Sequence, residues 1–218
     1  MRKLLLALML VMPMARAVLV DGVAISVGNT VITRSEIDQR IRLTAFLNGE
    51  TADTGEVSRR EAAQRLIEQK LIAREMDLGH YPRRGSDAAQ TMLDAWAKAN
   101  YGGDPAALAA RAAEYGLTPG EIGAELVWQS EFLTFLNLRF RPAVQVTDEQ
   151  IRAYFMEKFA ARMPAAQQEA ALIELHPQIE EALTVEGSDR ELDAWLRDQR
   201  QRTRIDYVDK SLLEPPAK

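Results

Sequence analysis

Apolar and polar positions alternate near the start of the chain, from Val23 to Val27, and a second short run follows from Thr30 to Ile32. A period of two residues is typical of half-buried strands. Gly28 and Asn29 lie between the two runs and can supply the positive φ that a two-residue turn needs. The pattern therefore predicts a β-hairpin.

Beyond the hairpin the apolar period becomes that of helices, and capping-box spacings occur where the pattern restarts. In a capping box, a Ser or Thr side chain accepts from a first-turn amide, and a Glu or Gln three residues later accepts from the cap amide. Five pairs have this spacing: Thr33 with Glu36, Ser58 with Glu61, Thr118 with Glu121, Thr147 with Gln150, and Ser188 with Glu191. The chain is therefore predicted to be mainly α-helical.

Apolar stripes and breakers give the extent of the middle helices. The helix after Ser58 is expected to end near Leu78 and Gly79, and a third helix is expected over Ser86 to Asn100. A short Ala-rich helix should open at Asp104 and Pro105 and stop at Gly116. The longest helix is predicted from Pro119 to about Phe140. The stripe of the helix after Ser58 is assigned to the core: Ala63, Leu66, Ile67, Leu71 and Arg74.

The first residues have the pattern of a cleavable export signal. Arg2 and Lys3 precede an apolar run from Leu4 to Met12, and Ala15-Arg16-Ala17 supplies small residues for a signal peptidase. We expect cleavage after Ala17 and a periplasmic location. The apolar run is about half of the roughly 20 residues that a membrane span needs, so no span is expected.

The composition narrows the possible partners. The 218-residue chain contains no Cys, which excludes disulfides and a lipid-modified cysteine and fits an oxidising periplasm. Its formal charge is −5, from 27 basic and 32 acidic residues. Removal of residues 1–17 takes away three basic residues (27 − 3 = 24) and brings the charge to −8. Nucleic acid is therefore not an expected partner.

Four stretches taken together resemble the N-terminal domain of SurA-type periplasmic chaperones: Val23 to Asp38, Leu66 to Gly79, Tyr115 to Leu126 and Val146 to Phe155. The resemblance implies a helical chaperone domain with a small hairpin near its N-terminus. In that family a final helix and strand return to complete the domain, and Leu192 to Val208 resembles this return. Ile205 and Tyr207 alternate as in a strand that could pair with Val23 to Val27.

The chain departs from this family where a parvulin prolyl isomerase domain would be inserted. Such a domain needs on the order of a hundred residues, whereas only twelve lie between Phe159 and Leu172. The predicted organisation is a signal peptide (1–17), a SurA N-terminal-like helical domain (18–160), a linker or helical extension (161–187), a returning helix and strand (188–210) and a tail (211–218).

Enzyme chemistry has little support in the sequence. His80 and His176 are the only histidines and have no partner at ligand spacing, so no metal site is expected. No nucleophile-elbow pattern, phosphate-binding Gly-rich loop or Cys nucleophile is present. Acidic pairs such as Glu180 with Glu181 are expected on the solvated surface. No cofactor and no catalytic residue are predicted.

A protein that binds unfolded chains needs partly exposed apolar side chains. Trp128, Phe132 and Trp195 are assigned mainly to the core. For other aromatics, client contact and core packing are comparable interpretations, and flexible Met side chains also suit promiscuous surfaces. The candidate client-binding residues are Trp96, Tyr101, Phe135, Phe140, Met92 and Met156.

The predicted function is an ATP-independent periplasmic chaperone that holds unfolded exported polypeptides, including outer-membrane proteins. A prolyl isomerase, or a subunit completed by a separate isomerase, is the first alternative. The second is an envelope adaptor that binds one folded partner. A monomer and a domain-swapped homodimer both remain open, because the final helix and strand follow a short linker.

Overall fold

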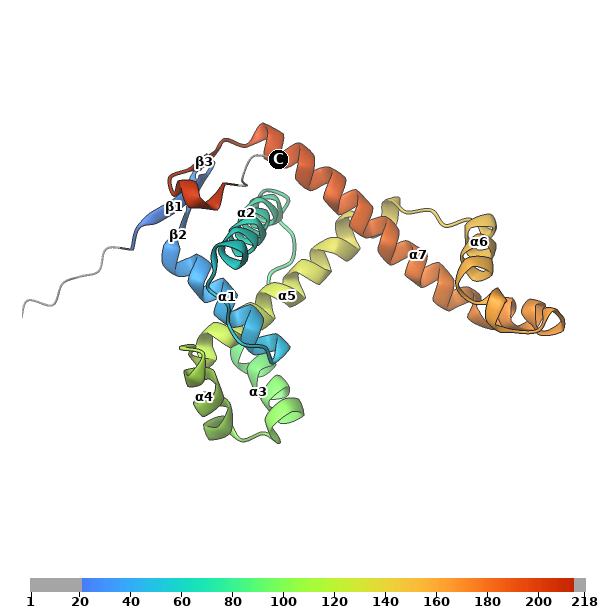
Figure 1. Cartoon of the computed structure of the whole chain (residues 1–218), viewed down its shortest axis with the longest axis horizontal. Coiled ribbons are helices and arrows are strands. Elements are labelled where there is room, and N and C mark those ends of the chain that lie inside the picture. Colours follow the sequence, from blue (N-terminus) through green and yellow to red (C-terminus); the bar gives the residue numbers. More distant parts are fainter. Residues whose placement is uncertain (1–20, 214–218) are drawn as a thin grey trace, which may run out of the picture.

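The computed structural model describes residues 21–213, and this range is mainly helical with a small antiparallel sheet (Figure 1). The predicted fold class is confirmed. The predicted signal peptide and its cleavage after Ala17 lie outside the described residues. The elements are β1 (Val23–Val27), β2 (Thr30–Thr33), α1 (Arg34–Asn48), α2 (Glu56–Leu78), α3 (Ala88–Tyr101), α4 (Pro105–Glu114), α5 (Pro119–Arg139), α6 (Asp148–Lys158), α7 (Ala165–Arg202) and β3 (Ile205–Tyr207), with short 3₁₀ turns η1 (Arg141–Ala143), η2 (Ala160–Arg162) and η3 (Lys210–Leu212).

The sheet joins the two ends of the described chain. Its strand order is β2-β1-β3, and β3 pairs antiparallel with β1, with Ile25 opposite Tyr207. The predicted pairing of the returning strand is thereby confirmed. Gly28 has the positive φ, 56°, that the hairpin turn requires. Its N–H donates to the carbonyl of Arg204 over 2.9 Å, which ties the hairpin turn to the returning chain.

Three of the five predicted capping boxes have both of their hydrogen bonds, at Thr33, Thr118 and Thr147. At the start of α1, the Glu36 amide donates to the Thr33 hydroxyl over 3.2 Å. The Glu36 carboxylate accepts from the Thr33 amide over 2.7 Å. These local hydrogen bonds fix the starts of α1, α5 and α6 at the predicted positions.

The other two predicted boxes are wrong. Helix α2 begins at Glu56, ahead of Ser58, whose hydroxyl donates to the Asp53 carboxylate over 2.8 Å. Ser188 lies within α7 and donates to the Thr184 carbonyl over 2.8 Å. A Ser side chain can bond back to the preceding turn as well as cap a helix, so its spacing to a later Glu does not prove a helix start.

The buried side chains form three clusters along the chain. The first joins the sheet to α1, α2, the end of α5 and the end of α7, around Ile25, Ile67 and Phe135. The second joins the end of α1 to α3, α4 and the start of α5, around Leu93 and Ile122. The third joins α6 to the first half of α7. Trp128, Phe132 and Trp195 pack against the first cluster, in agreement with their assignment to the core.

Helix α7 connects the first and third clusters (Figure 1). It is 38 residues long and includes Pro177 in its interior. The segment 161–187, predicted as a linker or helical extension, is mostly helical and continues into the returning helix without a break. The chain after α5 contacts the middle of α7, where Arg141 Nη1 donates to Glu181 Oε1 over 2.8 Å.

Candidate functional site

Three of the predicted client-binding residues lie on α3. Trp96 and Tyr101 are half-buried, and their ring centroids are 5.6 Å apart. Trp96 also contacts Phe46 of α1 with a centroid distance of 5.6 Å. Met92 is half-buried and lies one helical turn before Trp96. Trp96 and Tyr101 pack against the second cluster and keep part of their surface in contact with solvent.

Phe135 and Phe140 belong to the core, so their assignment to client binding is wrong. Their exposed fractions are 0% and 5%. The Phe135 ring packs edge-on against Tyr81 at 4.9 Å, and both phenylalanines lie 6.0 Å from the Trp195 ring. The helical pattern of α5 places them on an apolar face, and Tyr81 after α2 and Trp195 of α7, both distant in the sequence, help to cover that face.

Met156 lies on α6 and is 58% exposed. It borders a shallow depression that Phe155 and Leu172 also line. The six predicted residues are therefore divided among α3, the first cluster and the surface of α6, and they do not form one common site.

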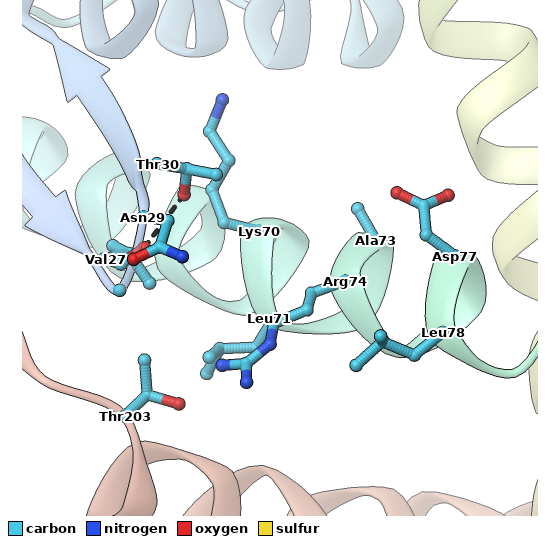
Figure 2. A pocket seen from close by; sticks show the side chains of 11 residues that line it. Val27, Asn29, Thr30, Lys70, Leu71, Ala73, Arg74, Asp77, Leu78 and Thr203 are labelled. Carbon is cyan, nitrogen blue, oxygen red and sulfur yellow. Dashed lines mark hydrogen bonds between the residues drawn. The ribbon is translucent and has the colours of Figure 1, made fainter.

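A hollow of about 390 Å³ lies between the turn of the β1–β2 hairpin, the second half of α2 and the residue that follows α7 (Figure 2). None of the six predicted residues lines it. Its lining comes from three separate parts of the sequence: Val27, Gly28, Asn29 and Thr30; Lys70, Leu71, Ala73, Arg74, Asp77 and Leu78; and Thr203.

The side chains that line this hollow along one side of α2 are mainly apolar. Val27 and Leu71 are buried at 4% and 3% exposure, whereas Leu78, at the end of α2, is 68% exposed. Apolar side chains thus continue from the core to an exposed leucine. An exposed large apolar side chain that continues an apolar depression is typical of a binding surface.

Two of the three charged residues at the hollow have partners within the chain. Lys70 Nζ lies 3.0 Å from Glu36 Oε1, and Asp77 is 2.6 Å from the Arg83 guanidinium. Among residues 21–213, Arg74 has neither an ion pair nor a side-chain hydrogen bond. Figure 2 shows Arg74 reaching toward Thr203, while Lys70 and Asp77 extend to the other side of α2.

Thr203 contributes a hydroxyl group to the hollow. The residue is 8% exposed, and its backbone N–H continues the hydrogen bonding of α7 by donating to Gln199 over 3.0 Å. Its hydroxyl makes no hydrogen bond within the described part of the chain. A Cβ at position 28 would lie in ordinary van der Waals contact, 3.5 Å from the Thr203 methyl group and 3.9 Å from Arg74 Nη1, so the positive φ of the turn and not the space accounts for glycine here.

The apolar stripe of the helix after Ser58 predicts that Leu71 and Arg74 both lie in the core. The assignment is confirmed for Leu71, but it is wrong for Arg74, which is exposed at the edge of the hollow. A cation within an apolar stripe was the available signal, since such a residue commonly marks where the stripe reaches the surface. No local sequence pattern marks Thr203 as a residue of the hollow, because its position there depends on the return of β3 to the sheet.

A second hollow, between α1, α2 and α5, is more polar. Arg40 and Glu125 form an ion pair across it, with 2.8 Å between Nη1 and Oε1, and Gln39 donates to Glu121 over 2.6 Å. Its polar groups are therefore engaged with one another. It is a weaker candidate for apolar ligands than the hollow at Leu71 and Arg74.

The described residues offer little for metal chemistry. Within residues 21–213 no three His, Asp or Glu side chains are grouped as metal ligands. His176 is half-buried and its ring lies 3.5 Å from Asp148, while His80 follows the end of α2 with a φ of 51°. None of the helices in this range combines the length and apolar character needed to cross a bilayer.

Neither a scan against protein-family models nor a search of curated proteins gave a match for this chain.

Proposed function

We propose that this protein is an ATP-independent periplasmic chaperone of the SurA type, without an isomerase domain, that holds unfolded exported polypeptides such as outer-membrane proteins. The observation that carries the proposal is the apolar hollow at the hairpin turn, which continues into the exposed Leu78. Such a surface suits an apolar side chain of an extended client chain. The proposed mechanism requires no covalent chemistry and no cofactor.

The order of elements supports the proposed class. A hairpin, a capped helix and a returning strand that pairs with β1 are the features on which the resemblance to SurA-type chaperones rests. The location remains part of the proposal. It is supported by the signal-like sequence of residues 1–17 and by the absence of cysteine from the chain.

The energetics favour weak and reversible holding. Burial of one apolar side chain of a client contributes about 1.5–3 kcal/mol. Micromolar affinity requires about 8 kcal/mol, so a client would need several contacts at once. The half-buried Trp96 and Tyr101 on α3 are proposed as a second contact surface. Contacts of this strength exchange quickly and accept many sequences.

The test compares two charge substitutions at exposed leucines. Leu78→Asp changes the hollow, whereas Leu133→Asp changes an α5 residue that is 58% exposed and lies away from the hollow. A denatured outer-membrane protein is diluted with each variant, and aggregation is followed by light scattering. We expect the unchanged protein and Leu133→Asp to suppress aggregation and Leu78→Asp to lose most of that effect. If the unchanged protein does not suppress aggregation even at an excess over the client, the proposed function is wrong.

A further inference from the structure

We infer that the hollow binds the carboxyl-terminal residue of an unfolded chain, with its apolar side chain against Val27 and Leu71 and its terminal carboxylate on the Arg74 guanidinium. This inference rests on the proposed function, and it names the part of the client that this hollow selects.

The charge at the hollow points to an anionic group. Arg74 is the one charged lining residue without an ion-pair partner in the range 21–213, since Lys70 is paired with Glu36 and Asp77 with Arg83. A guanidinium presents several N–H donors in a plane and can bind both oxygens of a carboxylate. Asp77 also lines the hollow, but it extends away from the end of Arg74 (Figure 2).

A second polar group lies beside Arg74. The Thr203 hydroxyl reaches the hollow from a residue that is 92% buried (8% exposed), and it has no hydrogen-bond partner within residues 21–213. The oxygen of this hydroxyl is open to the hollow, so a ligand oxygen can replace water as its hydrogen-bond partner. A carboxylate bound to Arg74 would give this hydroxyl an acceptor in the same place.

The combination of apolar and cationic groups selects a chain end over an internal acidic residue. At a C-terminus the carboxylate and the last side chain are attached to the same Cα atom, so one residue can satisfy Arg74 and cover Leu71. An internal Asp or Glu carries its carboxylate in place of the apolar side chain. It would therefore leave the apolar surface between Val27 and Leu71 without a matching group.

The test uses the full chain and a short, unstructured peptide that carries a fluorescent dye and ends in phenylalanine. The same peptide is prepared with a free carboxylate and with a terminal amide. Binding is measured by fluorescence anisotropy. We expect the free acid to bind about tenfold more tightly than the amide, as is typical for the loss of one charge-assisted hydrogen bond.

The Arg74→Gln variant should bind the acid and amide peptides with equal affinity. This affinity should match that of the unchanged protein for the amide. Arg65→Gln is the matched control, because Arg65 is an exposed residue of the same helix outside the hollow. It should retain the tenfold difference. Equal binding of acid and amide by the unchanged protein, or an Arg74→Gln variant that still distinguishes them, would overturn the inference.

Light scattering with a long denatured client separates this inference from the proposed function. Suppression of aggregation without any preference for the free acid would overturn the carboxylate inference and leave the chaperone proposal intact. A preference for the acid that depends on Arg74, without suppression of aggregation, would support the carboxylate site and reject the chaperone proposal.

Discussion

Gly187 of α7 faces Val144 so closely that a Cβ at position 187 would lie 2.5 Å from Val144 Cγ1. Val144 follows η1, in the segment that leads from α5 to α6. Glycine at 187 therefore permits this segment to pack on the middle of α7. The contact helps to fix the position of α6 relative to the first cluster.

Gly187→Ala should destabilise the protein by about 1 kcal/mol or more, because the added methyl group must displace Val144. This loss should exceed the gain of up to about 1 kcal/mol that alanine has over glycine in a helix. Chemical denaturation measures the free energy of unfolding. Gly120→Ala is the control, since its added Cβ would have no atom nearer than 4.0 Å, and it should be neutral or stabilising. Equal effects of the two substitutions would show that the contact with Val144 is unimportant.

Glu131 of α5 forms hydrogen bonds with the loop that connects α2 to α3. Its carboxylate accepts from the Arg84 backbone N–H over 2.7 Å and from Arg83 Nη1 over 2.8 Å, and its side chain is 10% exposed. Glu131→Ala should cost about 1–3 kcal/mol, because it removes two hydrogen bonds to a charged acceptor that is itself nearly buried.

Hydrogen exchange provides the specific measurement for Glu131→Ala, and the Arg84 amide should exchange faster. Glu114→Ala is the comparison, because Glu114 is 59% exposed and pairs with Arg111 on the surface. Such pairs contribute about 0–1 kcal/mol. An Arg84 amide that remains as protected as in the unchanged protein would contradict the assigned role of Glu131.

Phe135 should behave as a core residue and not as a client contact. Phe135→Ala is expected to destabilise the protein by about 3–5 kcal/mol, because the ring is fully buried against Tyr81 and Trp195. Leu133→Ala, an exposed site on the same helix, should change stability by less than about 0.5 kcal/mol. Thermal unfolding of both variants decides the matter, and a Phe135→Ala variant with unchanged stability would contradict the burial.

The start of α5 should depend on pH through Glu121. The backbone N–H of Thr118 donates to the Glu121 carboxylate over 2.6 Å and lowers the pKa of this group below its usual value of 4.5. A lowered pKa in the folded state means that the stabilisation is fully present above the unfolded pKa and is lost as the pH falls through the folded pKa.

Glu121→Gln should therefore reduce the loss of stability between about pH 5 and pH 3. Urea denaturation at several pH values gives the two stability curves. They should converge as the pH falls, because protonation removes the advantage of the carboxylate in the unchanged protein. Curves that remain parallel over this range would show that Glu121 does not contribute to the acid sensitivity.

Much of the fold follows from short-range patterns. The Thr33 capping box and the hairpin were predictable because each depends on residue type and alternation within a few positions. The pairing of the returning strand with β1 joins distant parts of the chain, and it was expected from the resemblance to SurA-type chaperones together with the alternation of Ile205 and Tyr207. The continuity of α7 was not predictable. Ser188 has the spacing to Glu191 of a helix cap, but its hydroxyl donates to the Thr184 carbonyl within the helix. Local sequence does not distinguish these two uses of a serine.

The sequence predicted the candidate site less well than it predicted the fold. Phe135 and Phe140 have the pattern of a wide apolar face, and their burial depends on Trp195, which lies far along the chain. The hollow likewise combines Gly28, Arg74 and Thr203, whose proximity depends on the return of the C-terminal strand.

Photo-crosslinking from position 78 tests the central claim most directly. The chain contains no cysteine, so Leu78→Cys and Leu133→Cys each introduce one attachment point for a cysteine-reactive photo-crosslinker. Each labelled protein is illuminated with a denatured outer-membrane protein and with the same client in its folded form. We predict adducts to the unfolded client mainly from position 78 and few from position 133. Absence of adducts from position 78, or equal labelling of folded and unfolded client, would contradict the claim that this hollow holds unfolded chains.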